Sequence, residues 1–453
     1  MNETAPLIAA LRQLHSRQID LSLDRLPRLL AALGHPEQHL PPTIHVAGTN
    51  GKGSVVALLK AMLEAGGTRV AAYTSPPLLD LGDAITVPVV SPQPSPAASA
   101  PVSATELAAC LRQVLEANAG APLTSFEGET AAAFLAISRS GAEAAIIEAG
   151  MGGLDDATNL IAPPAAAIIT PIGLDHLEFL GPTLADIARH KAGIIKDGVP
   201  VFSARQDEEA EATIETAARI RRAPLARAGR DFDAFEQHGR MVYLEHAEDV
   251  GGRLLDLPLP ALRGRHQIDN AALAIAALSA LGPRAPDEKA IAAGLQSVAL
   301  PARLDRLGPR GLARALRAGS EIWIDGGHNH AAATRIAHYM AELEERSTKP
   351  LAIVLGMLRT KDPAAFLEPF HDLAALVVAV PVGDVSRAYA RAFEPRHLAD
   401  IARAAGFESE SAAGVEQALQ IARRLSGGPV RVLVCGSFHL AGEVIAADRA
   451  ARA

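Results

Sequence analysis

The segment HVAGTNGKGS, residues 45–54, is a glycine-rich turn that contains one lysine, Lys52. It follows the short apolar run of residues 40–44 and precedes the helix-like stretch of residues 55–64. Glycines allow backbone N–H groups to turn toward an anion, and the N-terminus of the following helix adds a partial positive charge. The lysine adds a mobile full charge. The segment therefore predicts a polyphosphate site, and an ATP-using enzyme is the first hypothesis.

The spacing of this loop departs from the common phosphate-loop pattern G-x-x-x-x-G-K-[ST]. Val46 stands in place of the first glycine, and Gly53 stands in place of Ser or Thr, with Ser54 one residue later. The alternative is an ordinary strand–helix turn with a surface lysine. The strand–turn–helix context is the one that the motif requires, so the phosphate interpretation is favoured.

Length and composition narrow the class of protein. A chain of 453 residues with 49% hydrophobic residues predicts two or three domains with sizeable cores. The net charge of −8 argues against a general nucleic-acid binder. Cys110 and Cys435 are too few for a disulfide framework or a cysteine metal cluster. Neither a signal-peptide pattern nor an apolar stretch long enough for a membrane is found, so we expect a cytoplasmic protein with no membrane partner.

Apolar runs that end in polar or glycine-rich turns indicate the fold class. These runs are residues 144–147, 165–169, 322–324, 351–355 and 432–434, with alanine-rich helical stretches between them. Continuous apolar runs that alternate with helices are typical of parallel sheets covered on both faces. We therefore predict an α/β fold, in which ligands bind beyond the carboxyl ends of the strands.

Two breaks in this pattern are visible. Residues 88–104 are rich in Pro, Ser and Ala, which predicts a flexible surface loop. Leu300-Pro301 follows the helix-like residues 287–298, and a second strand–helix series begins near residue 321. We therefore predict domains at residues 1–299 and 300–453.

Glu148 and His176 each follow a predicted strand of the first domain. A carboxylate at a strand end that faces a phosphate loop is well placed for Mg²⁺, which prefers oxygen ligands. The alternative for Glu148 is an exposed strand-end glutamate. For His176, a structural position is more common than a ligand position when the histidine stands alone after a strand.

Lys191 is the most unusual single residue. Thr183 and Asp186 predict a helix start with a reciprocal cap, and Lys191 then lies on the face that carries Leu184 and Ile187. An unpaired ammonium is costly on an apolar face. Such a lysine is paired, deprotonated or modified. The alternative is a side chain that extends along the apolar surface to water.

The second domain repeats the pattern of polar turns after strands. Residues 325–329, 356–362 and 436–437 follow three apolar runs, and together they predict a second substrate-facing wall, although each is compatible with an ordinary turn. Arg303 lies at the predicted domain junction. It could contact nucleotide phosphate, or only form a salt bridge between the domains.

The ordered set of motifs resembles the bacterial folylpolyglutamate synthase/dihydrofolate synthase family of the Mur ligase superfamily. The motifs are residues 45–54, 148–159, 173–176, 191–196, 264–271 and 325–329, and the resemblance runs from about Ile19 to Glu443. It implies an N-terminal P-loop-type Mur ligase central domain, a C-terminal Rossmann-like Mur ligase domain, and an active site between them. It also implies that ATP phosphorylates a carboxylate and that the amine of L-glutamate attacks the acyl phosphate. The acceptor would be dihydropteroate, a reduced folate, or both, and the protein would be a monomer.

The resemblance also implies residue roles. ATP would contact Thr49, Asn50, Gly51, Lys52, Gly53, Ser54, Asn270, Arg303 and Asp325. Two Mg²⁺ ions would be held by Ser75, Glu148, His176 and a carbamylated Lys191. The catalytic residues would be Lys191, His176, Asp325 and His328, with Asp325 and His328 near the incoming glutamate. Segments that contact the pterin would include Ile19, Asp20, Leu21, Phe126, Glu127, Asp155, Asp156 and Ala157.

Several positions depart from the family pattern. Pro77 and Ala84 replace a histidine and an arginine, Leu154 replaces an arginine, and Asp155 replaces a leucine. These changes cluster near the expected pterin side, whereas the ATP and metal positions are intact. Two alternatives therefore remain: a ligase of the same superfamily with another acceptor, and an ATP-binding protein without catalysis.

Overall fold

The computed structural model describes residues 3–15, 19–89, 97–246, 252–383 and 391–452. The chain divides into two compact units, one of residues 1–261 with 267–299 and the other of residues 262–266 with 300–453. Each unit contains a mostly parallel sheet. The predicted α/β class is confirmed.

The first unit contains an eight-stranded sheet in the order β4-β3-β2-β5-β1-β6-β7-β8. Its central strands β2, β5, β1 and β6 run parallel, so their carboxyl ends lie along one edge. β3 and β4 continue the sheet antiparallel to β2. The strands are β1 (Thr43–Ala47), β2 (Val70–Tyr73), β3 (Ile85–Pro88), β4 (Ser99–Pro101), β5 (Ala144–Glu148), β6 (Ala166–Ile169), β7 (Val201–Ser203) and β8 (Leu225–Arg227).

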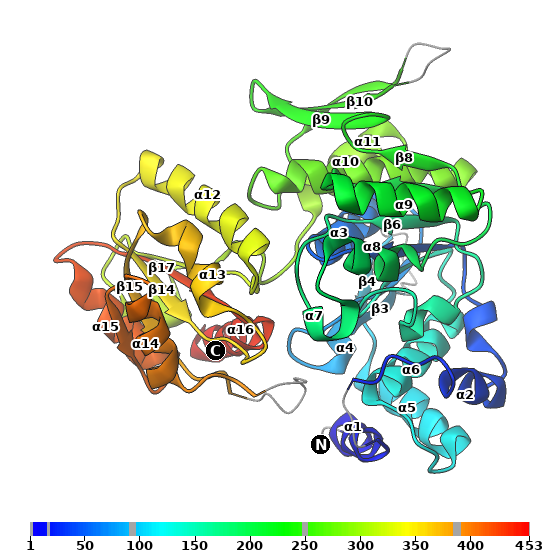
Figure 1. Ribbon diagram of the computed structural model, residues 1–453, viewed down its shortest axis with the longest axis horizontal. Helices are drawn as coiled ribbons and strands as arrows, with labels where there is room; N and C mark the ends of the chain where they lie inside the picture. The colour runs from blue at the N-terminus through cyan, green and yellow to red at the C-terminus, as the bar shows by residue number, and fades with distance from the viewer. Residues whose placement is uncertain (1–2, 16–18, 90–96, 247–251, 384–390, 453) are drawn as a thin grey trace. The chain divides into compact units, whose positions relative to one another are not determined.

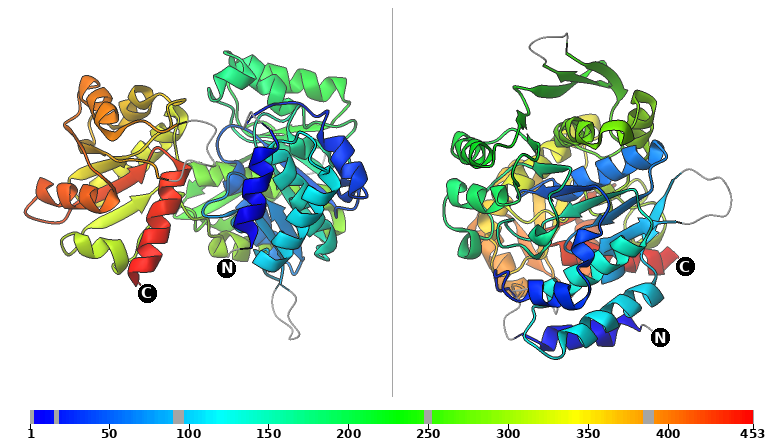
Figure 2. Two further views of the ribbon diagram at one scale, coloured as in Figure 1. Left: turned by 90° about the horizontal axis from the view of Figure 1, so that it is seen from below. Right: turned by 90° about the vertical axis from the view of Figure 1, so that its right-hand side faces the viewer.

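Helices cover both faces of this sheet (Figures 1 and 2). α3 (Lys52–Ala65) packs against β1, β2 and β5, and α11 (Glu288–Ser297) packs against α3. α6 (Ser125–Arg139) packs against β2 and β3, with α5 (Ala104–Asn118) behind it. The other elements are α1 (Thr4–Gln13), α2 (Leu26–Ala32), α4 (Leu81–Ala84), α7 (Leu177–Leu180), α8 (Leu184–Ala192), α9 (Glu208–Ile220), α10 (His266–Leu278), and a small sheet of β9 (Phe232–Gln237), β10 (Arg240–Glu245) and β11 (Leu254–Pro258).

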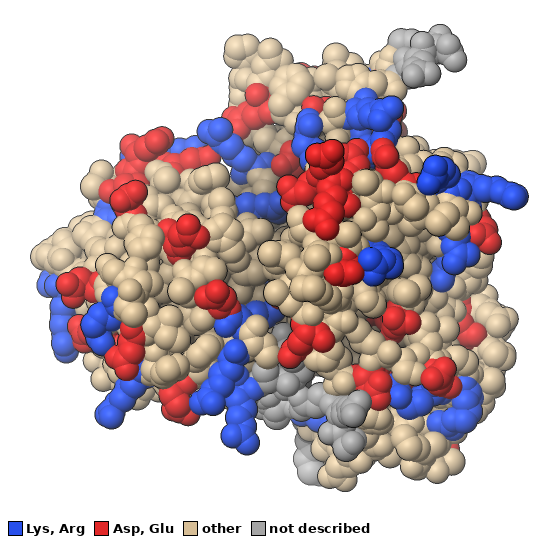
Figure 3. Space-filling model, viewed as in Figure 1, with Lys and Arg blue, Asp and Glu red and all other residues tan. Residues whose placement is uncertain are grey.

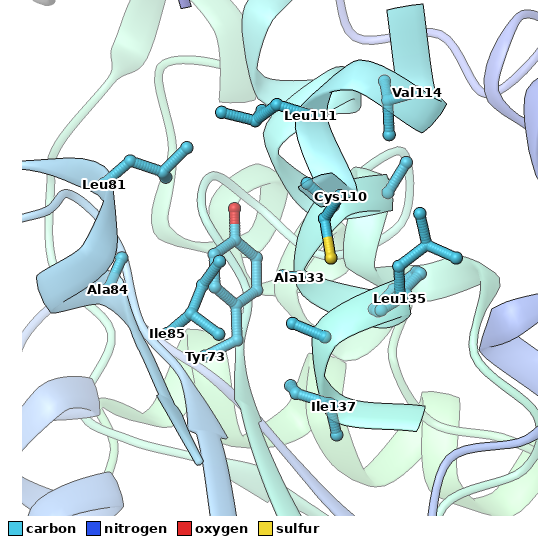
Figure 4. Close-up of a cluster of buried hydrophobic side chains, with 14 of the residues drawn as sticks. Tyr73, Leu81, Ala84, Ile85, Cys110, Leu111, Val114, Ala133, Leu135 and Ile137 are labelled. Carbon is cyan, nitrogen blue, oxygen red and sulfur yellow. The ribbon is translucent and has the colours of Figure 1, made fainter. Parts of the chain in front are cut away.

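The core between α5, α6 and the sheet explains why these helices form. Apolar side chains of α5 and α6, among them Leu111 and Leu135, face Tyr73 and Ile85 of the sheet (Figure 4). Cys110 lies in this cluster as a free, buried thiol. Burial of such side chains stabilises the fold by about 1.5–3 kcal/mol each.

The second unit contains a six-stranded sheet in the order β12-β13-β17-β14-β15-β16, parallel except for β12. A separate apolar core joins this sheet to its helices. The elements are β12 (Asp305–Arg306), β13 (Glu321–Ile324), α12 (His330–Arg346), β14 (Leu351–Leu355), α13 (Pro363–Leu367), β15 (Ala374–Ala379), α14 (Pro395–Ala404), β16 (Ser409–Ser411), α15 (Val415–Ala422), β17 (Arg431–Cys435) and α16 (Phe438–Arg452).

Two local predictions are wrong. The first strand is residues 43–47 rather than the run 40–44, because His45 is accommodated inside the sheet by a hydrogen bond to Thr158. The predicted loop of residues 88–104 contains β4, which pairs with β3, and Ser103 caps α5 by accepting from Glu106 N. Residues 90–96 of that prediction lie outside the described residues.

The surface carries both signs of charge. Figure 3 shows acidic side chains gathered over α9, whose first turn contains Glu208, Glu209 and Glu211. Arg227 forms ion pairs with Glu211 and Glu215 of that helix. In the part of the chain that the structure describes, no helix is long and apolar enough to cross a membrane.

Candidate functional site

The polar residues of the first unit meet because the central strands end side by side. The register places Val46 beside Glu148, and Tyr73 beside Ile147. The loop of residues 48–54, Ser75 and Glu148 therefore emerge from three adjacent strands. Residues 170–176 follow β6, the fourth neighbour, which is paired with β1. These segments therefore lie at one edge of the sheet.

The loop of residues 48–54 is held tightly against the end of β6. Thr49 N and Asn50 N both donate to Pro171 O, at 3.0 and 3.2 Å. Gly48 has a φ of +148°, and a Cβ there would stand 1.8 Å from Thr170 Oγ1, so glycine is required. Because these two N–H groups are used within the protein, the first turn of α3 supplies the remaining amides for an anion.

Lys52 lies over the loop that it follows. Its Nζ donates to Gly48 O at 3.2 Å and to Thr49 O at 3.4 Å, and it stands 3.9 Å from Glu148 Oε1. The lysine is thus pre-positioned at the place where a polyphosphate would lie on the loop. Glu148 is buried and faces the loop, so the alternative of an exposed strand-end glutamate is wrong.

Two side-chain amides of α10 contact the loop of residues 48–54. Asn270 Nδ2 donates to Gln267 Oε1 at 2.9 Å, and Gln267 Nε2 donates to Ser54 Oγ at 3.3 Å. A Cβ on Gly51 would stand 2.7 Å from Asn270 Oδ1. Asn270 was predicted at this site, whereas Gln267 was not. The signal for Gln267 is its position three residues before Asn270 in the first turns of a helix whose remaining residues, 271–278, are all apolar, which places both amides on one face.

The groups around this loop fit a Mg²⁺ ion bound together with phosphate. Ser75 Oγ is buried and has no hydrogen-bond partner among the described residues. Glu148 ends β5 and His176 comes after β6, the two strands that flank β1. No cluster of three or more His, Cys, Asp or Glu side chains within the described ranges would hold a metal alone. Mg²⁺ commonly takes one or two carboxylates, water, and oxygens of a phosphate substrate. A sparse oxygen donor set beside a phosphate loop is therefore the expected arrangement.

Lys191 extends from α8 to the same loop. The predicted cap is present, because Thr183 Oγ1 accepts from Asp186 N and Asp186 accepts in return. The lysine is only 4% exposed, and its Nζ donates to Gly48 O at 2.7 Å. Snorkelling to water, the alternative interpretation, is therefore wrong. Burial, helped by the Lys52 cation, lowers the pKa of Lys191 to about 7, while Asp175 and Asp156 act in the opposite direction.

The segments expected to contact the pterin also come together in the first unit. Phe126 stacks on Tyr73 with 6.4 Å between ring centroids, and its ring packs against Gly150, where a Cβ would stand 2.4 Å away. Leu21 and Met151 pack against one core cluster. Ile19 and Ala157 lie in these same segments, half-buried and buried respectively.

Charged side chains connect the same segments. Arg25 donates to Asp20 at 3.3 Å and to Glu127 at 3.1 Å. Glu127 also closes the capping box of α6, and its Oε1 is buried without a hydrogen-bond partner in the described parts of the chain. Asp155 lies 3.8 Å from His190, whereas both carboxylate oxygens of Asp156 accept hydrogen bonds within its own loop. Leu154 is 43% exposed, so its side chain lies on the surface of this loop.

The second unit presents its own group of polar turns. Gly436 N donates to Gly327 O and Gly356 N donates to Cys435 O, so the turns after β13, β17 and β14 lie at one edge as predicted. Asp325 accepts from Leu304 N at 2.8 Å and from Gly327 N at 2.7 Å. Burial raises the pKa of Asp325, and the Arg303 guanidinium opposes this shift.

Arg303 and His328 flank this carboxylate. Arg303 stands over the Phe438 ring, 4.9 Å from its centroid, and donates to Ala302 O. His328 Nδ1 lies 3.1 Å from Gly326 O. The turn of residues 325–328 is therefore ordered by its own hydrogen bonds.

Known proteins share this architecture. Residues 107–278 match the family model of the Mur ligase middle domain, and residues 313–447 match that of the dihydrofolate synthetase C-terminal domain. The dihydrofolate synthase/folylpolyglutamate synthase of Mycobacterium tuberculosis is 34% identical over 376 residues, which cover 78% of this chain and 74% of that protein.

Solved structures match over the whole length. Escherichia coli FolC in complex with DHPP and ADP superposes with a TM-score of 0.84 at 29% identity, and the match covers 100% of both chains. A bifunctional folylpolyglutamate synthase/dihydrofolate synthase with Mn, AMPPNP and L-glutamate bound gives a TM-score of 0.81 at 28% identity and covers 99% of both chains.

Proposed function

The chain belongs to the folylpolyglutamate synthase/dihydrofolate synthase family of ATP-dependent ligases, and we propose that it joins L-glutamate to the carboxylate of dihydropteroate or of a reduced folate. ATP is consumed to ADP and phosphate through an acyl phosphate. The convergence of Lys52, Glu148 and Lys191 on the loop after β1 is the observation that carries this proposal. Relatives have been solved with ADP, AMPPNP, Mn, L-glutamate and DHPP.

ATP binds through its phosphates at residues 49–54. The first-turn amides of α3 and the Lys52 ammonium neutralise part of the phosphate charge. The side chain of Asn270 packs against Gly51 of the loop. Phosphoryl transfer depends mainly on such positioning and charge neutralisation. Arg303 and Asp325 are proposed to contact the nucleotide from the second unit.

Ser75, Glu148, His176 and Lys191 would hold two divalent ions. When bound, the ions supply positive charge to the transferring phosphoryl group. Lys191 would contribute as a carbamate, because a buried amine with a pKa near 7 is substantially neutral at physiological pH, and only the neutral amine adds carbon dioxide. Its Nζ already points to Gly48 O at the phosphate loop.

The acceptor carboxylate must lie within reach of the terminal phosphate. The pterin is proposed to bind against Leu21, Phe126 and the loop of residues 150–159. The segments that carry these residues also include the other proposed substrate-binding residues, Ile19, Asp20, Glu127, Asp155, Asp156 and Ala157. Asp325 and His328 are proposed to receive the incoming L-glutamate, whose amine attacks only in its neutral form. Exclusion of water during this step protects the acyl phosphate from hydrolysis.

A phosphate-release assay tests the proposal. Purified protein with ATP, Mg²⁺, L-glutamate and either dihydropteroate or tetrahydrofolate is expected to release phosphate only when every component is present. The product should gain one glutamate by mass spectrometry. Lys52→Ala should abolish turnover, whereas Lys60→Ala on the same helix should not. Absence of glutamate addition to both acceptors would contradict the proposed function and leave another acceptor as the explanation.

A further inference from the structure

His45 is a fully buried histidine to which the proposed reaction gives no part. It lies in the middle of β1, paired with Ile147 of β5 and Ala167 of β6, with 0% of its surface exposed. Its Nε2 lies 2.9 Å from Thr158 Oγ1. A polar ring inside a sheet is costly unless it is hydrogen-bonded, so this single contact is the reason that the site tolerates a histidine.

The hydrogen bonds beyond Thr158 fix the direction of the contact. Thr158 Oγ1 donates to Asp156 Oδ1 at 2.6 Å. Asp156 also accepts from Thr158 N at 3.0 Å and from Met151 N at 2.8 Å, so both of its oxygens serve as acceptors. A hydroxyl has one proton, which Thr158 gives to Asp156. The oxygen of Thr158 therefore accepts from His45 Nε2–H.

The direction of this hydrogen bond defines the tautomer of the His45 imidazole. With Nε2 protonated, Nδ1 is a bare nitrogen, and it is buried without a hydrogen-bond partner among the described residues. Burial, with a smaller contribution from Lys196, lowers the pKa of His45 to about 3. The ring is thus a fixed neutral donor at all physiological pH values.

Asp156, at the opposite end of this hydrogen-bond chain from His45, organises the loop of residues 150–159. Asp156 closes the loop by accepting from Met151 N, next to Gly150, which packs against Phe126. Asn159 Nδ2 donates to Leu154 O in the same loop. The near end is β1, which leads directly into Gly48 of the phosphate loop.

We propose that His45 is a positioning residue that, through Thr158, orients Asp156 and thereby holds residues 150–159 in the geometry required by the acceptor. The inference rests on the proposed function, in which this loop contacts the pterin. It assigns His45 to the acceptor side of the reaction, although the residue belongs to the strand that supports the ATP site.

Two pairs of variants test this assignment. Thr158→Val removes the hydroxyl without changing the shape of the side chain, whereas Thr158→Ser keeps it. His45→Gln retains an N–H near the place of Nε2, whereas His45→Asn is too short to reach Thr158. Thr158→Val and His45→Asn are expected to raise the KM of the acceptor about tenfold, a coupling typical of residues in one hydrogen-bond network. The KM of ATP should stay within about twofold, and Thr158→Ser and His45→Gln should remain close to wild type.

Thr43→Val is the matched control. Thr43 is buried in the same strand, and its hydroxyl donates to Pro41 O at 2.7 Å, away from the loop. This variant should lower the Tm without changing the KM of the acceptor. The double variant His45→Asn/Thr158→Val should be no worse than the poorer single variant, because the two residues act as one unit.

The outcomes separate the inference from the proposed function. If His45→Asn and Thr158→Val lower only the Tm, or raise both KM values equally, the positioning role is wrong although wild-type turnover stands. Multiplicative effects in the double variant would also overturn it. A wild-type protein that uses no pterin acceptor would overturn both proposals.

Discussion

At the scale of single residues, the informative feature of this protein is the number of polar groups that it buries. Lys191 could be predicted from the sequence because helical periodicity places it on an apolar face. His45 could not, because its partner Thr158 is distant in the sequence. Periodicity shows which polar residue is buried, but only the fold shows which hydrogen-bond partner it has.

Lys191 carries the first prediction at this scale. Lys191→Ala should lower kcat by at least about a hundredfold, as for other groups that stabilise charge in the transition state. Short-chain carboxylates such as acetate should restore part of the activity by replacing the carbamate. Phosphate release with and without acetate measures both effects, and Lys60→Ala is the control for loss of a lysine elsewhere. Full activity of Lys191→Ala would refute the assigned role.

The pKa of Lys191 adds a dependence on pH. Burial lowers this pKa to about 7, so the amine is mostly neutral above that pH and mostly protonated below it. At equal concentrations of dissolved carbon dioxide, depleted enzyme should therefore regain activity readily at pH 8 and poorly at pH 6. Equal recovery at both values would show that protonation of Lys191 does not limit the reaction, and full activity without added carbon dioxide would show that the carbamate is not required.

At the scale of elements, the sequence predicts the type of each central element better than its boundaries. The runs 144–147, 351–355 and 432–434 all lie in strands, since continuous apolar runs suit sheets covered on both faces. β4 was missed because its three residues, Ser99–Pro101, lack an apolar pattern and depend on pairing with β3. Strand ends depend on such tertiary contacts, which single-sequence patterns do not contain.

The buried ion pair between the first residues of β13 and β17 supports a prediction about stability. Glu321 of β13 is the direct neighbour of Arg431 of β17, and it accepts from Arg431 Nε at 3.1 Å, Lys349 Nζ at 2.7 Å and Trp323 Nε1 at 3.2 Å. Desolvation alone would raise the pKa of Glu321, but these donors outweigh it and lower the pKa to about 2. Glu321→Gln should reduce the free energy of unfolding at pH 7 by about 3 kcal/mol, because it leaves Arg431 buried and incompletely paired.

The dependence on pH follows from the direction of the shift. A carboxyl group with a lowered folded-state pKa stabilises the fold above its unfolded-state value of 4.5, and this contribution is lost as the pH falls toward 2. The stability difference between wild type and Glu321→Gln in urea unfolding should therefore shrink below about pH 4.5. Glu344→Gln is the control: that side chain is 37% exposed, and its loss should cost less than about 1 kcal/mol. A pH-independent difference would exclude the ionic explanation.

At the scale of the whole molecule, the ordered motifs imply the family, and the family implies residue roles that no single motif could establish. The phosphate loop alone is an imperfect match, because Ser54 comes one residue late. The side-by-side strand ends place Ser75 and Glu148 at the edge of the sheet that carries the phosphate loop. Lys191 reaches the same loop from α8 through its hydrogen bond to Gly48 O. The departures at Pro77, Ala84 and Leu154 leave the choice between dihydropteroate and folates to experiment.

The two units should also respond separately to damage in their cores. The core around Leu433 contains only residues of the second unit, and the core around Leu111 contains only residues of the first. A buried Leu→Ala change costs about 2–5 kcal/mol, and local stability differs between cooperative parts of a protein. Leu433→Ala should therefore accelerate hydrogen exchange in peptides from residues 300–453 and leave residues 1–261 protected, whereas Leu111→Ala should do the reverse. Mass spectrometry of deuterated peptides measures the exchange in both units. Addition of MgATP should increase the protection of residues 48–54 in the Leu433→Ala variant, because the phosphate loop belongs to the unit whose core is unchanged. Faster exchange in both units after either substitution would mean that the molecule unfolds as one cooperative body.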